Sequence, residues 1–341
     1  MTTVPARHAD LFDITTVIFR GELELLELQA ASLDRFFPAE LVRRILVLLN
    51  DVDEEACGAA VERLRPAYGK LAPKVQIASP ADLFALRPAE LTRQQPRNWP
   101  AHWFTKYRHR WPWGRKGGWR GNRGWSVQQA LKLAVGRAVQ APYVLILDAK
   151  NHLVRPVTVG SFVGPDGRPR SHLACRDRQQ RRWIEASFIR MGMTPPAPDA
   201  PAPPSVTPVS VRTDVLRGAV DAIERRIGPV ETFFARKRKF ETEFMLLYAY
   251  VVGRYGDWSA AFEEGLVPPA TIFRSTGDEA IRELLDRVER GEADFLAIHG
   301  SRMGKLEPDV QARLEAIWRR CELPLPGRSG ARSSTGSEAA G

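Results

Sequence analysis

The chain has 341 residues, of which 44% are hydrophobic and 26% are charged, and its net charge is +10. This composition is typical of an ordinary globular protein with an ample core. No apolar run approaches the ~18 residues that a membrane span needs. The N-terminal segment also lacks the apolar stretch of a secretory signal, so we expect a cytoplasmic protein.

The excess of basic residues favours anionic partners, such as nucleotides, phosphorylated lipid carriers, acidic membranes or nucleic acid. An arginine-rich composition explains the same excess equally well. The three cysteines, Cys57, Cys175 and Cys321, lie far apart and show no CxxC spacing. This pattern indicates reduced thiols and argues against a structural zinc site.

Strand and helix alternate at the start of the chain. The expected elements are a strand at 11–19, a helix at 22–37, a strand at 42–49, a helix at 54–70 and a strand at 74–78. β-Branched residues favour the first strand, and Pro38 ends the first helix. Two successive β-α-β units predict right-handed crossovers and an α/β fold with a Rossmann-like, mainly parallel sheet flanked by helices.

Residues 124–155 form the most informative stretch. An amphipathic helix is followed by a break at Pro142 and by a buried strand at 143–147 that runs directly into Asp148. An uninterrupted apolar strand is typical of the centre of a parallel sheet, which we expect to place it beside the strands at 14–18 and 44–48. Ligands bind at the carboxyl ends of such strands, so Asp148 is a candidate site residue.

The remaining sequence predicts a second half that is richer in helices. The expected elements are an irregular segment at 93–125, a hairpin at 162–172 with its turn at Pro165-Asp166-Gly167, a Pro/Ala-rich connector at 194–208, helices at 212–226, 234–255, 278–290 and 308–321, strands at 270–273 and 295–299, and a disordered tail from 323 or 324 to 341. Tryptophan, arginine and glycine alternate in the segment at 93–125. It suits a lid over a sugar nucleotide or a seal over the core better than a site for single-stranded nucleic acid.

Polar residues at the ends of the first two strands are candidates for nucleotide binding. Thr15 and Thr16 can hold a base or ribose, and Arg20 can hold phosphates. Alternatively, the threonines reflect β-propensity and the arginine is a solvated side chain. Asp51 can accept hydrogen bonds from ribose or uracil, or it can cap the following helix.

Asp148 is the more specific candidate for catalysis. A carboxylate at this position can bind Mn²⁺ or Mg²⁺, which would bridge it to a diphosphate leaving group. The second acid of such a pair is missing, and Lys150 and Asn151 follow instead. A lysine can neutralise phosphate directly and reduces the need for metal. The alternative is a strand-end turn capped by the aspartate.

The helix before this strand and the second half supply further candidates. Gln128, Gln129 and Lys132 lie on the helix and can reach a sugar or phosphate, or can face solvent. Glu243 begins a strongly apolar helix, where burial would raise its pKa and suit it to act as a general base. His299 ends a strand and can bind metal, and Lys305 can meet a phosphate. The alternatives are a helix-start acid and a structural histidine.

Five segments resemble an uncharacterised bacterial family of unknown function that is related to glycosyltransferases of the A-type fold. They are residues 12–38, 124–134 (GWSVQQALKLA), 145–151 (LILDAKN), 241–251 (ETEFMLLYAYV) and 298–305 (IHGSRMGK). The resemblance implies that Asp148 takes the place of the first acid of the DxD metal motif. Lys150 stands where the second acid would be, which puts dependence on Mn²⁺ or Mg²⁺ in doubt.

The resemblance further implies a single domain over residues 10–322, with a flexible segment at 1–9 before it. Residues 10–160 would form the nucleotide-binding half and residues 161–322 the acceptor half. We expect transfer of a sugar from a nucleoside-diphosphate sugar to a glycan or lipid-linked acceptor, in the synthesis of a surface polysaccharide and with peripheral membrane contact. The alternatives are a non-catalytic protein that binds nucleotide sugars or glycans and, less favoured, a protein that binds single-stranded nucleic acid.

Overall fold

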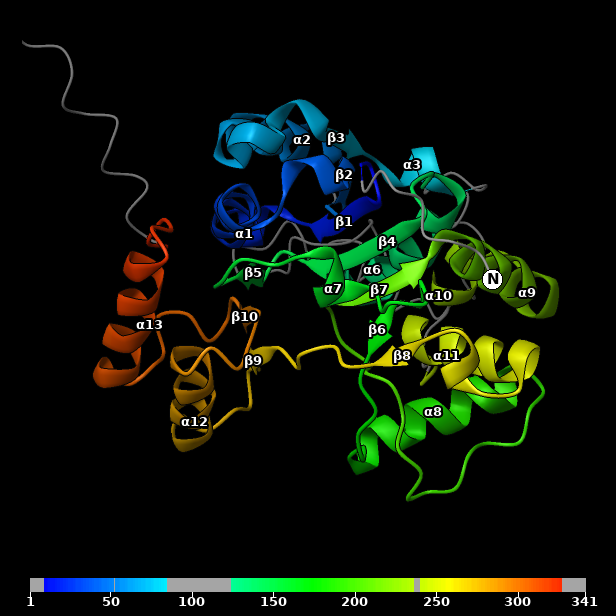
Figure 1. Ribbon diagram of the computed structural model, residues 1–341. Helices are drawn as coiled ribbons and strands as arrows, with labels where there is room; N and C mark the ends of the chain where they lie inside the picture. The colour runs from blue at the N-terminus through cyan, green and yellow to red at the C-terminus, as the bar shows by residue number, and fades with distance from the viewer. Residues whose placement is uncertain (1–8, 52, 85–123, 236–239, 327–341) are drawn as a thin grey trace, which may run out of the picture.

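A mainly parallel five-stranded sheet forms the centre of the molecule, with the strand order β3-β2-β1-β4-β7 (Figure 1). The computed structural model describes residues 9–51, 53–84, 124–235 and 240–326. The strands are β1 (Phe12–Ile18), β2 (Val42–Leu49), β3 (Val75–Ala78), β4 (Tyr143–Asp148) and β7 (Val209–Arg212). Only β7 in this sheet runs antiparallel to its neighbour. The predicted α/β class and the predicted neighbouring strands are therefore confirmed.

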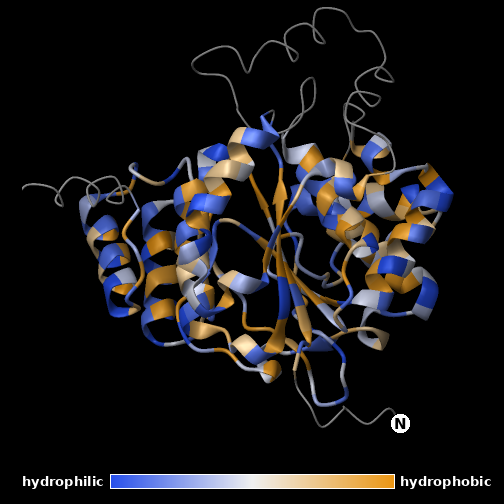
Figure 2. Cartoon of the chain, turned by 90° about the horizontal axis from the view of Figure 1, so that it is seen from above, coloured by the Kyte–Doolittle hydropathy of each residue, from blue (hydrophilic) through white to orange (hydrophobic). Residues whose placement is uncertain are grey.

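Helices cover both faces of this sheet, which explains why its strands are almost continuously apolar. Viewed from above, the apolar strands stand between two groups of helices whose outer faces are hydrophilic (Figure 2). Alternate side chains of β1 pack into two hydrophobic cores, one on each face of the sheet. Phe12 and Ile14 belong to the first core, and Val17 belongs to the second. The first core contains residues of α1 (Leu23–Phe36) and α2 (Glu54–Leu64). The second contains residues of α6 (Gly124–Ala134), α8 (Arg178–Arg190), α9 (Thr213–Ile227), α10 (Val230–Ala235) and α11 (Glu243–Tyr255).

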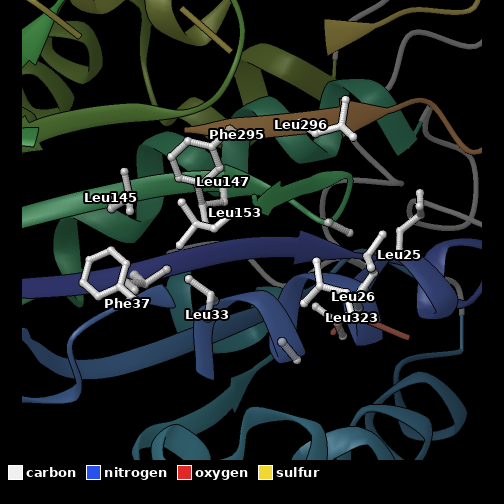
Figure 3. Close-up of a cluster of buried hydrophobic side chains, with 14 of the residues drawn as sticks. Leu25, Leu26, Leu33, Phe37, Leu145, Leu147, Leu153, Phe295, Leu296 and Leu323 are labelled. Atoms are coloured by element: carbon white, nitrogen blue, oxygen red, sulfur yellow. The ribbon is translucent and has the colours of Figure 1, made fainter. Parts of the chain in front are cut away.

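A second, three-stranded sheet extends the first core. It pairs β10 (Phe295–Ile298) antiparallel with β5 (Asn151–Leu153) and parallel with β9 (Ala270–Ile272). α12 (Asp278–Glu289) and α13 (Pro308–Arg320) pack on the same core. Figure 3 shows Leu153 and Phe295 of this small sheet in the same buried cluster as Leu33 of α1 and Phe37, the residue that follows α1. The C-terminal elements are thus packed against the N-terminal ones.

Two predicted helices are wrong in their extent. The helix expected at 54–70 ends as α2 at Leu64, and a 3₁₀ segment, η3 (Arg65–Lys74), follows. Pro66 lacks a backbone donor, and Gly69 has a φ of 45°, so the α-helix cannot continue through them. The helix expected at 234–255 is divided into α10 and α11. The segment before α11 is extended at Thr242.

The break before α11 has a physical cause in its own side chains. Glu241 is buried and accepts a hydrogen bond from Arg190 Nε of α8 at 2.7 Å. A buried carboxylate needs such a partner, and the contact holds residues 240–242 outside the helix. Because hydrophobic periodicity cannot register a contact of this kind, the sequence predicted one continuous helix.

The other predicted segments agree with the structure more closely. The hairpin at 162–172 is reduced to one antiparallel bridge between Val163 and Pro169, after which β6 (Arg170–Ser171) pairs parallel with β8 (Glu263–Glu264). The connector at 194–208 contains no helix, as expected, and one bridge at Ala202. The short elements that remain are η1 (Arg20–Glu22), η2 (Ala39–Leu41), α3 (Pro80–Leu83), η5 (Val135–Arg137), α7 (Val159–Phe162) and η6 (Trp258–Ala260).

Three predictions concern residues that the structure does not describe. Residues 1–8 of the flexible segment expected at 1–9, the Trp/Arg/Gly-rich segment up to residue 123 and most of the tail lie outside the described residues. Across the helices that are described, none is both long enough and apolar enough to span a membrane.

Candidate functional site

The candidate site lies where β1 and β4 end. The two strands are parallel, and Val17 of β1 lies beside Asp148, the last residue of β4. A turn over Ala149 and Lys150 then leads into β5. The predicted carboxyl-edge position of Asp148 is therefore the observed one.

A buried hydrogen-bond network fixes this turn. Asn151 Oδ1 accepts from the backbone N–H of Asp148 at 2.8 Å. Gln29 Nε2 of α1 donates to the backbone oxygens of Asp148, at 2.7 Å, and of Asn151, at 2.8 Å. The hydroxyl of Thr16 in turn donates to Gln29 Oε1 at 2.7 Å. Fully satisfied buried networks are rigid, so the side chains on the turn are held in place.

The Asp148 carboxylate is surrounded by donors from three elements. Lys132 Nζ lies 2.6 Å from Oδ1, and Gln128 Nε2 donates to the same oxygen at 2.7 Å; both residues belong to α6. Lys150 Nζ lies 3.2 Å from Oδ2, and Thr207 Oγ1 lies 2.9 Å from it. Burial opposes ionisation of Asp148, but the positive charges of Lys132 and Lys150 outweigh it and lower the pKa.

Glu243 joins this group through Lys132. Lys132 Nζ lies 3.3 Å from Glu243 Oε1 and 5.3 Å from the centre of the Phe244 ring. Burial raises the pKa of Glu243 against the opposing effect of Lys132. Burial lowers the pKa of Lys132, but the carboxylates of Asp148 and Glu243 outweigh it, so the lysine stays charged. We call Gln128, Lys132, Asp148, Lys150, Thr207 and Glu243 the Asp148 cluster.

Glu22 is a further carboxyl group near the cluster, and it was not among the residues predicted from the sequence. It ends η1, immediately after β1, and its side chain is partly buried. Burial, and then the negative charge of Asp148, raise the pKa of Glu22 to about 7. The same rule that selected Asp148 and Asp51, a polar residue just beyond a strand, would have selected Glu22 as well.

Arg20 and Asp51 form a separate pair further along the same edge. Arg20 donates to Asp51 from Nε at 3.2 Å, from its second terminal nitrogen at 3.0 Å and from its backbone N–H at 3.0 Å. Asp53, whose side chain accepts from the N–H of Ala56, is the cap of α2. The alternative role that we considered for Asp51, capping of the following helix, therefore belongs to Asp53. The Asp51 carboxylate accepts hydrogen bonds from Arg20 instead.

The loop after β10 approaches the Asp148 turn. Ala297 pairs antiparallel with Asn151, so the residues that follow β10 run beside the turn that precedes β5. His299 is the first of them and is exposed, with its Nδ1 2.9 Å from Ser301 Oγ. On the neighbouring strand end, the ring of Phe273 is centred 5.8 Å from Lys150 Nζ. Lys305 lies on the same loop and is exposed.

Besides Asp51 and Lys132, four of the predicted binding residues are buried inside the protein. Thr15 and Thr16 are enclosed in the sheet, and the amide of Asn151 is used within the turn. Gln129 is buried on α6, where its nitrogen lies 3.5 Å from the backbone oxygen of Trp125. The structure thus brings Lys132, Asp148, Lys150 and Glu243 together. It encloses Thr15, Thr16, Gln129 and Asn151 inside the protein. Binding of a ligand by any of these residues stays a prediction.

A large cavity lies at the other edge of the sheet. It has a volume of about 1060 Å³ and is lined near the start of β4 by Tyr143, Arg170, Arg212 and Asp214, among others. Its size alone would make it a candidate ligand site. We place the site at the Asp148 edge instead, because Lys132, Asp148 and Glu243 are buried in contact there and their charges shift one another's pKa values.

The described residues contain no group of three or more His, Cys, Asp or Glu side chains that could hold a metal ion. Asp148 and His299 were the predicted metal ligands. Asp148 is occupied by the donors described above. Of the two predicted ligands for Mn²⁺ or Mg²⁺, Asp148 is thus already in contact with protein donors.

Comparison with known proteins places the chain beside one family and several solved structures. A model of the Family of unknown function (DUF6492) matches residues 13–269. No curated protein matches the chain. Among solved structures it is similar to the galactosyltransferase LgtC in complex with donor and acceptor sugar analogs, at 13% identity, over 91% of this chain and 99% of that chain, with a TM-score of 0.44.

Two further structures share this likeness. Mouse xyloside xylosyltransferase 1 in its apo form is 11% identical over 84% of this chain and 96% of that chain, with a TM-score of 0.37. The bifunctional glycosyltransferase WbbM in its apo form is 11% identical over 93% of this chain and 52% of that chain, with a TM-score of 0.41. These proteins are glycosyltransferases, as the resemblance in the sequence implied. At such scores they supply no argument about substrate or mechanism.

Proposed function

The chain belongs to the family of unknown function DUF6492, and from the geometry of its site we propose that it is a glycosyltransferase that uses a nucleoside-diphosphate sugar. One observation carries the proposal: two lysines and two carboxylates from distant parts of the chain converge on the carboxyl edge of the central strands. Packing alone gives no reason for four ionisable groups to meet there. Burying charged groups costs stability even when they are paired, and such groups gather most often at functional sites.

The cluster suits a diphosphate leaving group. Lys150 is the ammonium group on the exposed side of Asp148 and can contact a phosphate oxygen. Lys305, on the loop beside the turn, is a second candidate for the same group. Fixed positive charge at the place where negative charge develops is the most effective form of electrostatic catalysis.

The transfer also needs a group that accepts the proton of the acceptor hydroxyl. In that step the hydroxyl oxygen bonds to the anomeric carbon, the bond to the diphosphate breaks, and the nucleoside diphosphate leaves with the electron pair. Glu243 was the base expected from the sequence, but it is 5% exposed and paired with Lys132. Glu22, with a pKa of about 7 and partial exposure, is the better candidate for this proton.

The acceptor is a glycan or a lipid-linked sugar in this proposal, and the pathway is the synthesis of a surface polysaccharide. Peripheral contact with an acidic membrane would agree with the net charge of +10. The proposal retains one domain over residues 10–322, with donor binding in 10–160 and acceptor binding in 161–322.

The test is turnover of nucleoside-diphosphate sugars by the wild-type chain and by Asp148→Asn. We expect release of nucleoside diphosphate by the wild type and a loss of at least ~100-fold in the variant. Asp166→Asn is the matched control, because this exposed aspartate lines the cavity at the opposite edge.

The outcome separates the proposal from its rivals. Binding without turnover would indicate a non-catalytic nucleotide-sugar protein. Ligand at about a hundred times its Kd should raise stability by ~2.7 kcal/mol, which a thermal-shift assay detects. Neither binding nor turnover with any nucleoside-diphosphate sugar would refute the proposed function.

A further inference from the structure

The resemblance in the sequence implies a pair of acids that bind a divalent cation at this position. Mn²⁺ and Mg²⁺ need several oxygen ligands with free lone pairs. In this chain the two positions of that pair are occupied by Asp148 and Lys150. The fit of a cation to this site can be tested directly on the contacts of the carboxylate.

Both oxygens of Asp148 already have close donors. Oδ1 is in contact with Lys132 Nζ and Gln128 Nε2, at 2.6 and 2.7 Å. Oδ2 is in contact with Lys150 Nζ at 3.2 Å and with Thr207 Oγ1 at 2.9 Å, and the single proton of this hydroxyl is shared with Asn151 Oδ1 at 2.7 Å. A carboxylate offers about four lone-pair sites, and these donors occupy most of them. A metal ion would have to compete with them for the same oxygens.

Displacement is opposed by charge. The Lys132 side chain is 6% exposed and lies between Asp148 and Glu243. If it moved away, both of these buried carboxylates would lose the positive charge that pairs with them. A divalent cation that replaced Lys150 would then sit on the same carboxylate as the Lys132 ammonium, a few ångströms from a like charge. The residues present do not fit a divalent cation.

The two lysines instead supply the charge that such a cation would bring. Together they place two positive charges on the Asp148 carboxylate. Their exposure differs: the Lys132 side chain is 6% exposed and that of Lys150 is 16% exposed. Lys132 can therefore serve as an internal counterion, while Lys150 is able to reach a ligand.

We propose that the Lys132–Asp148–Lys150 arrangement replaces a divalent cation, and that this site binds the diphosphate group of its ligand without metal. Lys132 cancels the charge of Asp148, which would otherwise repel the ligand, and Lys150 donates to a phosphate oxygen. The identity of the ligand rests on the proposed function; the claim about metal does not.

The first experiment follows binding of a nucleoside diphosphate by calorimetry, in EDTA and in Mn²⁺. The wild type should bind no more tightly in Mn²⁺ than in EDTA, because Mn²⁺ complexes the diphosphate in solution and gains no ligand from the protein. Lys150→Met should lose at least ~10-fold in affinity in both conditions, because the lost ammonium contact is not one that metal restores. A wild-type affinity that rises tenfold or more with Mn²⁺ would overturn the proposal.

The second experiment needs no nucleotide. Lys150→Asp recreates two acids with one residue between them, and it should create a Mn²⁺ site that is detected by electron paramagnetic resonance of the free ion. The wild type should show no such site. Lys70→Asp is the matched control, since it makes the same charge change at an exposed lysine near the far end of α1.

The two experiments distinguish the two proposals. If no nucleoside diphosphate binds in either condition, the proposed function fails, and the Mn²⁺ titration alone decides the claim about metal. Mn²⁺ that binds to the wild type and is lost in Asp148→Asn would overturn that claim. A folded Lys150→Asp variant that gains no Mn²⁺ would overturn the role given to Lys150 in excluding the ion, since Lys132 alone would then account for the exclusion.

Discussion

Glu22 is a carboxyl group at the site edge whose pKa lies near neutrality. Burial, and then repulsion from the Asp148 carboxylate, raise its pKa from 4.5 to about 7, against the opposing effect of Lys150. Between these two values the folded chain holds a proton that the unfolded chain has released. The free energy of unfolding therefore falls as pH rises through this window, and the contribution is fully lost above pH 7.

Glu22→Gln should remove this fall in the free energy of unfolding with rising pH. The amide keeps the shape of the protonated acid and carries no charge at any pH. At pH 8 the variant should be more stable than the wild type by about 1–3 kcal/mol, a range that allows for partial exposure of the side chain, and at pH 4 the two should be nearly equal. Urea unfolding at both pH values measures the difference, with the exposed Glu24→Gln as control. An equal difference at pH 4 and pH 8 would contradict the assigned pKa.

Some site residues were predictable because their signal is local. Asp148 and Lys150 follow an uninterrupted apolar strand, and that pattern alone places them at a sheet edge. Gln29 and Thr207 carry no such signal. They contact the Asp148 turn from positions more than fifty residues away in sequence, through packing that periodicity does not encode.

α13 supports the Asp148 turn at the scale of elements. Trp318 Nε1 of α13 donates to His152 Nε2 of β5 at 2.9 Å. The other ring nitrogen of His152, Nδ1, must then carry the proton, and it lies 3.3 Å from the backbone oxygen of Lys150. Burial lowers the pKa of His152 to about 4, which keeps the ring neutral in this chain of contacts. The last helix is thereby connected to the lysine of the site.

Trp318→Phe should destabilise the chain by leaving His152 Nε2 buried without a donor. We expect a cost of about 1–3 kcal/mol from the lost hydrogen bond, in addition to the change in volume. Trp258→Phe is the control for volume, because Trp258 is also buried but its Nε1 has no hydrogen-bond partner within the described residues. Urea unfolding of both variants at pH 7 measures the difference. Equal losses of stability would show that the contact with His152 contributes nothing.

Whole elements were predictable where one periodicity extends over them. The strands β1, β2 and β4 and the helices α1, α9 and α13 lie within a few residues of their expected ranges. The break before α11 was not predictable, because it depends on the contact between Glu241 and Arg190 of another helix. The pairing of β5 with β10 joins residues more than a hundred positions apart and gave no sequence signal either.

The whole molecule presents two possible ligand sites at opposite edges of one sheet. The edge where β1 and β4 end has the ionisable cluster, whereas the edge where they begin has the cavity of about 1060 Å³. The proposed function depends on the first edge, because chemistry on a diphosphate needs charge that is fixed in place more than it needs volume. The proposed division into donor and acceptor halves depends on the same choice.

A crystal structure with a bound nucleoside-diphosphate sugar tests this choice most directly. We predict that a phosphate oxygen will lie about 3 Å from Lys150 Nζ, at the edge where β1 and β4 end. A diphosphate seated instead in the cavity lined by Tyr143, Arg170 and Arg212 would contradict the proposed position of the site.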